Sequence, residues 1–290
     1  MYKAGYLLSS LLAGSPFAGV QSDPDHRAIQ ISHHPEPAIR YCILLTPRSG
    51  SSWLADILTR TQRLGVPREY FNPAQMPIAA QSMNAANLAD YTAMLPRMRA
   101  QDGVFGMRVT YPQILTTFRS PHRFHSAFPG LRYFWLIRQD IVSQAISGSR
   151  MVQTRLRHLE EPSAQQAERA DDRFIYKPRD IRRRIRRLVW AETRTEAFFA
   201  RHAITPERIS YEALLRLSPD AVAARFANPL GIALPETLDA VSTHSRVSTS
   251  KSAEFARRFR TEQAHWLQKI DQRRAGLLSA LDQPAPVAKG

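Results

Sequence analysis

One stretch, from Tyr41 to Leu54, constrains the fold of this chain more than any other. It begins with the apolar run Tyr41 to Leu45, which predicts a buried strand, and it ends in apolar positions at helical spacing, which predict a helix over about residues 51 to 60. A turn between a strand and a helix points backbone N–H groups and the positive end of the helix dipole into one concavity. Such a turn suits a doubly charged oxyanion, although an ordinary strand-to-helix connection has the same pattern.

The turn carries its cation, Arg48, before its glycine, Gly50. A nucleoside-triphosphate P-loop has the order Gly-x-x-x-x-Gly-Lys-Ser/Thr, with the lysine after the second glycine. The turn therefore lacks the P-loop pattern, which argues against a kinase-like phosphotransferase.

The length of the chain indicates one sizeable core, because 290 residues with 43% apolar content suffice for a single domain with extensions. We expect an N-terminal arm over residues 1 to 38, one domain over residues 39 to 282, and a Pro/Ala-rich tail over residues 283 to 290. The apolar stretch from Ala4 to Val20 is too interrupted for a membrane span, and it resembles a signal peptide only faintly.

The single cysteine, Cys42, falls inside the first predicted strand and is expected to be a small buried side chain. One thiol forms no internal disulfide, and the sequence shows no Cys/His cluster with zinc spacing. These features predict a cytoplasmic protein without a structural metal.

The net charge of +15, with a pI near 10.7, predicts anionic partners. Much of the excess lies between Arg179 and Leu188, where Ile181, Ile185 and Leu188 form one apolar stripe on an arginine-covered helix. A solvated helix face is one interpretation of this stretch. The other interpretations are contact with nucleic acid, with an anionic glycolipid or with a partner subunit.

Further strands are predicted over Val104 to Val109, Arg132 to Ile137 and Arg208 to Tyr211. Helical patterns alternate with them, including residues 84 to 100, where Pro96 is expected to kink or split the helix, and residues 219 to 226. Alternation of this kind predicts an α/β fold: a three-layer, P-loop-like domain in which helices cover both faces of a central parallel sheet.

Ligands of a parallel sheet bind at the carboxyl ends of its strands, so the residues that follow each strand are candidates for one site. Arg138 directly follows the strand that ends at Ile137. Ser143 and Ser147 lie further along the chain, at helical spacing from each other. A strand-end arginine and a nearby serine can together hold a phosphate group. With the turn after Leu45, this arrangement predicts a nucleotide that carries phosphates at two separate places.

Three motifs resemble those of the Stf0-type bacterial sulfotransferases, a family that includes mycobacterial trehalose sulfotransferases and proteins described as lipopolysaccharide sulfotransferases. The motifs are Thr46-Pro47-Arg48-Ser49-Gly50-Ser51-Ser52-Trp53-Leu54, Gly65-Val66-Pro67-Arg68-Glu69-Tyr70-Phe71-Asn72, and Arg138-Gln139-Asp140-Ile141-Val142-Ser143-Gln144-Ala145-Ile146-Ser147. The resemblance covers roughly residues 40 to 270, because Tyr211 to Leu214 and Glu254 to Phe259 are also similar.

The resemblance implies 3′-phosphoadenosine-5′-phosphosulfate as the sulfuryl donor, a sugar or glycolipid hydroxyl as the acceptor, no metal, and a homodimer. It implies that the first turn holds the 5′-phosphosulfate and that Arg138 with Ser147, or with Ser143, holds the 3′-phosphate. The implied donor-binding residues are Pro47, Arg48, Ser49, Gly50, Ser51, Ser52, Trp53, Arg138, Ser143 and Ser147. Related sulfotransferases usually carry lysine in the first loop, and Arg48 in its place keeps the charge but cannot donate a proton.

Glu69 and Arg48 are the candidate catalytic residues. The resemblance favours a catalytic role for Glu69, either as a general base or as a group that orients the acceptor hydroxyls, over a salt bridge to Arg68 or another nearby arginine. Arg108 is either an active-site cation or a surface charge.

Tyr70 and Phe71 could form a wall for a sugar ring, although aromatic side chains in such positions more often belong to the core. Three cations, Lys251, Arg257 and Arg258, could close over the nucleotide, but a solvated helix face is the better expectation.

The leading function is therefore a carbohydrate or glycolipid sulfotransferase. A P-loop-like phosphotransferase and a non-catalytic basic module that binds nucleic acid or membrane are the alternatives. We expect no specific nucleic acid partner and a peripheral contact with an anionic membrane surface, at the inner face of the membrane. Residues 73 to 103 and 155 to 180 are expected to form the acceptor pocket, and trehalose, lipopolysaccharide and other glycans all remain open as acceptors.

Overall fold

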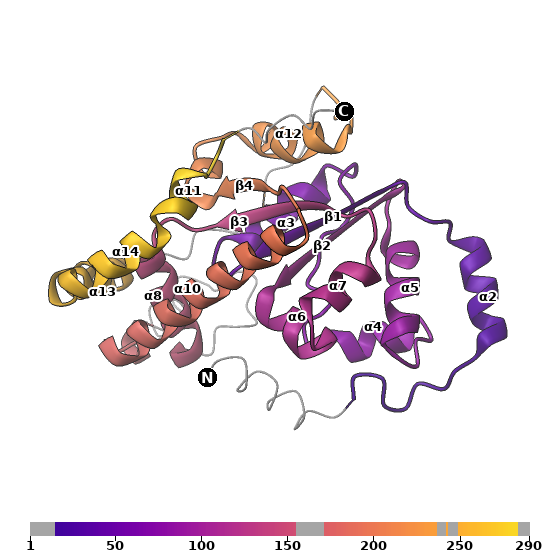
Figure 1. Cartoon of the computed structure of the whole chain (residues 1–290), viewed down its shortest axis with the longest axis horizontal. Helices are drawn as coiled ribbons and strands as arrows, with labels where there is room; N and C mark the ends of the chain where they lie inside the picture. Colours follow the sequence, from indigo (N-terminus) through magenta and orange to yellow (C-terminus); the bar gives the residue numbers. More distant parts are fainter. Residues whose placement is uncertain (1–14, 155–170, 237–241, 243–248, 284–290) are drawn as a thin grey trace.

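A computed structural model describes residues 15–154, 171–236, 242 and 249–283 of the chain. Its centre is a parallel sheet of four strands in the order β2-β1-β3-β4 (Figure 1). The strands are β1 (Ile39–Leu45), β2 (Val104–Thr110), β3 (Arg132–Ile137) and β4 (Glu207–Ser210). The predicted α/β class is confirmed, and so is each predicted strand to within one or two residues.

The strand order brings two predicted anion-binding segments together. The first strand, β1, pairs with β2 on one side and with β3 on the other, in parallel register with Leu45 opposite Leu136. The chain therefore changes direction across the sheet between β1 and β3, which is where doubly wound sheets bind their ligands. The turn after β1 and Arg138 after β3 lie at this point.

Alternate side chains of the strands face two apolar clusters, as expected for a sheet covered on both faces. One cluster joins the sheet to α4 (Met76–Ser82), α5 (Leu88–Arg99), α6 (Tyr111–Phe118), α7 (Pro121–Ala127) and the end of α10 (Pro178–Arg201). The other joins it to α3 (Ser51–Arg60), α11 (Tyr211–Leu214) and α12 (Pro219–Leu230). The three-layer arrangement is thus confirmed.

A third apolar cluster holds together a group of helices at the carboxyl ends of the strands. It joins α8 (Ile141–Thr154) and the first half of α10 to α13 (Ser250–Glu262) and α14 (Ala264–Ser279) (Figure 1). The stripe Ile181, Ile185 and Leu188 is buried in this cluster, so the amphipathic pattern of the arginine-covered helix is confirmed. The helix continues to Arg201, well past the predicted end of the stripe.

The predicted N-terminal arm contains a helix, α2 (Pro24–His33), which has no buried residue. An ion pair between Arg27 and Asp90 of 2.6 Å, together with a hydrogen bond from Asn84 to the carbonyl of Asp23, connects this helix to the domain. Phe17 and Val20 also pack against the core, and Arg97 pairs with Glu36, so residues 15 to 38 lie against the domain at several points. Residues 1 to 14 lie outside the described part of the chain.

Three predicted boundaries differ from the observed ones for identifiable reasons. Helix α5 begins at Leu88 because the Asn87 side chain caps it, and Pro96 lies inside a helix that stays continuous. Strand β4 ends at Ser210 because the Ser210 hydroxyl caps α11, so Tyr211 is helical. Helix α12 extends past Phe226 to Leu230 and ends at Gly231, which adopts a left-handed conformation.

Within the described ranges, no helix combines the length and the apolarity that crossing a bilayer would require.

Gly106 offers a test of the packing between β1 and β2. A Cβ atom at this position would lie 2.4 Å from the Tyr41 ring, which a 2.7 Å hydrogen bond to the Leu64 carbonyl holds in place. We predict that Gly106→Ala lowers the free energy of unfolding by about 1–3 kcal/mol in urea denaturation. The control, Gly276→Ala in α14, meets no atom within 4 Å and should raise stability by up to about 1 kcal/mol. Equal effects of the two substitutions would contradict this packing.

Candidate functional site

The turn after β1 has the geometry of an anion-binding loop. Arg48 and Gly50 adopt left-handed conformations, with φ of 67° and 82°. The first hydrogen bond of α3 runs from the Leu54 N–H to the Gly50 carbonyl, so the preceding N–H groups of the helix have no acceptor within it. The Ser49 side chain beside them is fully buried, and its Oγ has no hydrogen-bond partner among the described residues. The turn therefore presents several donors to one place.

Gly50 is required in this turn because the Tyr211 ring covers it. A Cβ atom at Gly50 would lie 2.2 Å from a Tyr211 ring carbon. The same ring contacts Trp53 edge to face at 6.3 Å and lies 5.2 Å from the Arg138 guanidinium. Tyr211 thus joins the turn, the start of α3 and the end of β3.

Several arginines gather around the turn. Arg48 Nε donates a 3.0 Å hydrogen bond to Ser147 Oγ, and Arg138 Nη1 donates a 3.1 Å hydrogen bond to the Arg48 carbonyl. Burial lowers the pKa of Arg48, and the charges of Arg138 and Arg150 lower it further. Because an arginine stays protonated in proteins, Arg48 is a partly buried cation with two further cations nearby, an arrangement that favours an anion.

A fourth arginine, Arg184, comes from the long helix α10. A Cβ atom at Gly148 would lie 3.4 Å from Arg184 Nη1 and 3.9 Å from Arg48 Cγ, so the two side chains meet over this glycine. The sequence analysis assigned no site role to Arg184 or to Arg150, because both are brought to the turn by tertiary packing.

Gln144 holds the turn against α8. Its Nε2 donates to Thr46 Oγ1 and to the Pro47 carbonyl, each at 2.8 Å, and the side chain is buried. This residue was quoted in the third motif, but its role was missed.

The end of β3 is organised differently from the end of β1. The Glu212 carboxylate accepts hydrogen bonds from the backbone N–H groups of Gln139 and Asp140, at 2.9 and 3.1 Å. These two donors are therefore already occupied by a carboxylate. The Arg138 guanidinium remains as the candidate group for binding an anion here, and its buried Nε has no hydrogen-bond partner among the described residues.

Arg274 of α14 fixes the backbone that carries Arg138. Its guanidinium donates to the carbonyls of Arg138 and Gln139 at 2.8 Å each, and it forms a buried ion pair with Glu192 of α10. Both side chains of the pair are almost fully buried, so removing either partner would leave a costly unpaired charge.

Ser147 and Ser143 have separate places. Ser147 binds Arg48 rather than Arg138, whereas the Ser143 N–H donates to Asp140 Oδ1 at 3.0 Å near the start of α8. The structure thus groups Ser147 with the turn after β1.

Glu69 is brought to the same edge of the sheet beside β2. Arg68 pairs with Met107 as an added parallel bridge, and the Arg108 N–H donates to the Arg68 carbonyl at 2.9 Å. The Glu69 Oε2 accepts a 3.0 Å hydrogen bond from Gln113, whose own Oε1 accepts from the Thr110 N–H. No ion pair with Arg68 occurs among the described residues, so the carboxylate is positioned by Gln113.

Arg108 lies beside Glu69 and is not a surface charge. Burial lowers the pKa of Arg108, while the neighbouring Glu69 carboxylate raises it. Its Nε donates to the Pro67 carbonyl at 2.8 Å, and its buried Nη1 has no hydrogen-bond partner in the described part of the chain. The interpretation as a cation of the site is therefore favoured.

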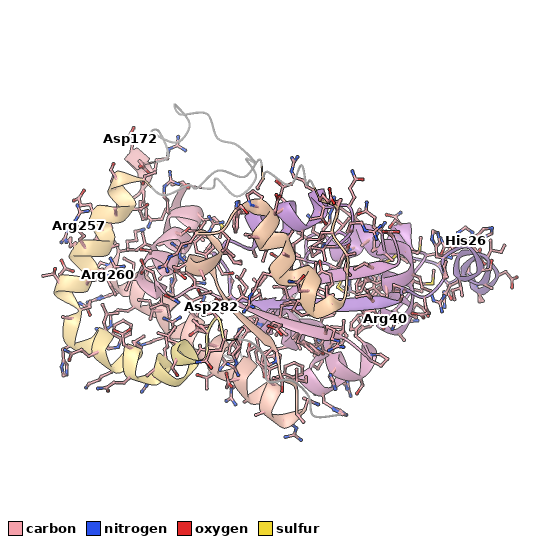
Figure 2. The ribbon with its side chains drawn as sticks, turned by 90° about the horizontal axis from the view of Figure 1, so that it is seen from above. His26, Arg40, Asp172, Arg257, Arg260 and Asp282 are labelled. Atoms are coloured by element: carbon pink, nitrogen blue, oxygen red, sulfur yellow. The ribbon has the colours of Figure 1, made fainter. Side chains whose placement is uncertain are left out.

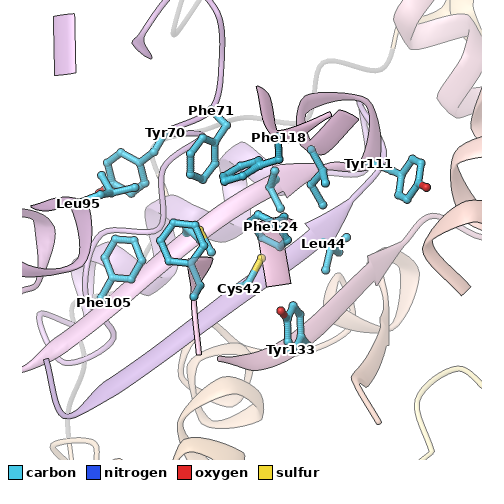
Figure 3. Packing of buried hydrophobic residues seen from close by; sticks show 14 of the residues in the cluster. Cys42, Leu44, Tyr70, Phe71, Leu95, Phe105, Tyr111, Phe118, Phe124 and Tyr133 are labelled. Atoms are coloured by element: carbon cyan, nitrogen blue, oxygen red, sulfur yellow. The ribbon is translucent and has the colours of Figure 1, made fainter. Parts of the chain in front are cut away.

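Tyr70 and Phe71 belong to the core, and the idea of an aromatic wall for a sugar is wrong. Phe71 is fully buried and packs edge to face on Phe118 at 5.0 Å, and Tyr70 is 6% exposed (Figure 3). Both face the apolar cluster on one side of the sheet. The reason is that this segment runs beside β2 as part of the layered core.

Lys251, Arg257 and Arg258 do not converge on the turn. Lys251 donates to the Asp171 carbonyl, Arg258 pairs with Glu262, and Arg257 is exposed on α13 (Figure 2). The cation of α13 that reaches the end of β3 is Arg260, which forms a 2.7 Å ion pair with Asp140.

The described residues contain no group of three His, Cys, Asp or Glu side chains that could hold a metal ion.

The fold and this site together define a P-loop-like α/β domain with several arginines near the carboxyl ends of its strands. The chain belongs to the Stf0 sulphotransferase family, whose family model matches residues 40–262. The protein is therefore a sulfotransferase, and the resemblance of the three motifs is confirmed. A comparison with curated proteins found no match.

Asp140 makes the link between α13 and the end of β3 sensitive to pH. Burial alone would raise the pKa of Asp140, but hydrogen bonds from Ser143 and the charge of Arg260 hold it below its ordinary value. This stabilisation is present above the pKa of the unfolded chain, near 3.9, and is lost as pH falls through the lower folded pKa. We predict that Asp140→Asn lowers the free energy of unfolding at pH 7 by less than about 1 kcal/mol, because solvent screens this partly exposed pair.

The difference between this variant and the wild type should shrink as pH falls toward about 3 in urea denaturation. Asp172→Asn, which removes an exposed carboxylate, serves as the control. A difference that stays constant from pH 7 to this acidic limit would contradict the role of Asp140.

Proposed function

We propose that this sulfotransferase moves the sulfuryl group of 3′-phosphoadenosine-5′-phosphosulfate to a hydroxyl of a carbohydrate or glycolipid. The observation that carries the proposal is the convergence of Arg48 and Arg138 at neighbouring strand ends, beside the first N–H groups of α3, which have no acceptor within that helix. A donor with anionic groups at two places fits this pair better than a simple phosphate does. Family membership favours sulfuryl transfer over the phosphotransferase and the non-catalytic basic module.

The turn after β1 fits the phosphosulfate end of such a donor. Its helix N–H groups, the Ser49 hydroxyl and the Arg48 guanidinium are all donors, and the buried Ser49 Oγ lacks a partner among the described residues. Arg138, with its unpaired Nε, then suits the 3′-phosphate. Because Ser147 lies with Arg48, we place it at the phosphosulfate side rather than at the 3′-phosphate.

The protein need not form a covalent bond with the substrate in this reaction, and its role is to position the reactants and to stabilise charge. Sulfuryl transfer resembles phosphoryl transfer, with an acceptor oxygen, the sulfur and the leaving phosphate oxygen in line. The acceptor oxygen forms the new bond to sulfur as the bond from sulfur to the phosphate oxygen breaks. Arg48 and the N–H groups of α3 stabilise the charge that collects on this leaving oxygen. Arg48 acts through charge and hydrogen bonds, since it cannot donate its proton.

Glu69 takes the proton of the acceptor hydroxyl in this proposal. Gln113 holds Oε2 and thereby aims the carboxylate, while Oε1 remains for the hydroxyl. Two strand spacings of about 4.8 Å separate the Glu69 segment from β1. The long side chains of Glu69 and Arg48 can therefore reach the two sides of one sugar hydroxyl.

The acceptor, the oligomeric state and the cellular location stay predictions. Trehalose, lipopolysaccharide and other glycans are candidate acceptors. The homodimer is expected from the resemblance, and the peripheral contact with an anionic membrane surface from the basic charge of the chain.

Transfer from labelled donor tests the proposal. The protein, incubated with ³⁵S-labelled donor and fractionated glycans, should label a hydroxyl of one fraction without added metal. Glu69→Gln should lower kcat by about 10²–10⁴-fold, the usual contribution of a general base, and leave nucleotide binding unchanged. Glu207→Gln, at the opposite end of the sheet, is the matched control.

No label in any fraction would overturn the proposed transfer. A Glu69→Gln enzyme as active as the Glu207→Gln control would remove Glu69 from the mechanism.

A further inference from the structure

The arginine-covered start of α10 borders a cavity that the function above does not use. The cavity has a volume of about 680 Å³. The described residues that line it are Tyr176, Lys177, Pro178, Arg179, Asp180 and Arg183. Three of the six carry a positive charge, and one carries a negative charge.

The negative charge of Asp180 is already compensated. Its carboxylate accepts hydrogen bonds from Arg183 at 2.5 Å, from Arg184 at 2.7 Å and from Ser149 Oγ at 2.8 Å. Burial alone would raise the pKa of Asp180, but these hydrogen bonds lower it, so the group stays ionised and occupied. It therefore offers little repulsion to a second anion in the cavity.

Two of the cations lack partners. The side chains of Lys177 and Arg179 are exposed and form no hydrogen bond or ion pair with any residue that the structure describes. Such cations can bind an anion without first breaking an ion pair, and they also give it the two donor types that suit phosphate and carboxylate groups.

The residues that line the cavity are connected to the turn after β1 through helix α8. Asp180 accepts from Ser149, and the next residue back, Gly148, is where Arg184 and Arg48 meet. One helical turn, about 5.4 Å along α10, separates Asp180 from Arg184. A sugar that offers a hydroxyl beside Arg48 can thus extend toward the cavity.

We propose that this cavity binds a negatively charged substituent of the acceptor, so that the preferred acceptor is a phosphorylated or acidic glycan rather than a neutral one. The proposal rests on the proposed function, since it concerns the acceptor of that reaction. Lys177, Arg179 and Arg183 contact the anionic group, and the Tyr176 ring offers an apolar surface to the attached sugar.

Calorimetric titration with a matched pair of sugars tests this proposal. The donor site is first filled with adenosine 3′,5′-bisphosphate, so that the sugar phosphate cannot bind there. Trehalose 6-phosphate should then bind at least about tenfold more tightly than trehalose, because only the former carries the anion. The double variant Lys177→Gln/Arg179→Gln should lose this preference.

Arg194→Gln/Arg201→Gln removes the same charge from the far half of the same helix and should keep the preference. Equal affinity of the two sugars for the wild type, no detectable binding of trehalose 6-phosphate, or a preference that survives in the Lys177→Gln/Arg179→Gln variant would each overturn the proposal.

Two further experiments distinguish this proposal from binding to a lipid surface and from a failure of the proposed function. Vesicles of phosphatidylglycerol that bind the wild type but not the Lys177→Gln/Arg179→Gln variant, while the sugar phosphate does not bind, would assign the cations to a lipid surface and overturn the glycan proposal. Failure of adenosine 3′,5′-bisphosphate to bind the wild type would instead contradict the proposed function. The difference in sugar phosphate affinity between the wild type and the Lys177→Gln/Arg179→Gln variant would in that case still report on the cavity, because both proteins have the same turn after β1.

Discussion

Repulsion between positive charges at the carboxyl ends of the strands is the constraint on which the rest of this structure depends. Arg48 and Arg138 lie at the ends of neighbouring strands, and Arg150 and Arg184 approach from two helices. The protein holds them there with fixed acceptors: the Arg48 carbonyl accepts from Arg138, and Asp180 accepts from Arg184. An anionic ligand would relieve the remaining repulsion, which is why we place the proposed donor site at the carboxyl ends of the strands.

The long helix α10 links the sheet to this charged edge. Its final turns place Phe198 and Phe199 in the core of one sheet face, while its first turns join α8 and α13 in the helical group at the strand ends (Figure 1). The same helix supplies Glu192, which pairs with Arg274 and so steadies the backbone after β3. Among the arginines of this helix, Arg184 lies near the turn after β1, whereas Arg179 and Arg183 line the cavity at the start of the helix.

The sequence predicted the parts of the fold that depend on local pattern. The strand and helix around the turn were expected within a residue or two, because apolar spacing and the glycine determine them locally. Because ligands of a parallel sheet bind at the carboxyl ends of its strands, the turn and Arg138 were also expected to lie close together. The strands that precede them, β1 and β3, are indeed neighbours. Gln113 and Gln144 escaped notice, because polar contacts between segments 44 and 98 residues apart leave no periodic signal. The burial of Tyr70 and Phe71 could not be predicted from the sequence either, since an aromatic pair in a loop motif can face a ligand or the core.

The binding of two phosphates by two strand ends is the central claim, and calorimetric titration with adenosine 3′,5′-bisphosphate measures it most directly. Wild-type protein should bind this nucleotide, and Arg48→Gln and Arg138→Gln should each weaken binding by about 10²-fold, as expected for the loss of charge-assisted hydrogen bonds. Arg132→Gln, at the other end of β3, should bind like the wild type. Unchanged affinity in both site variants would contradict the account.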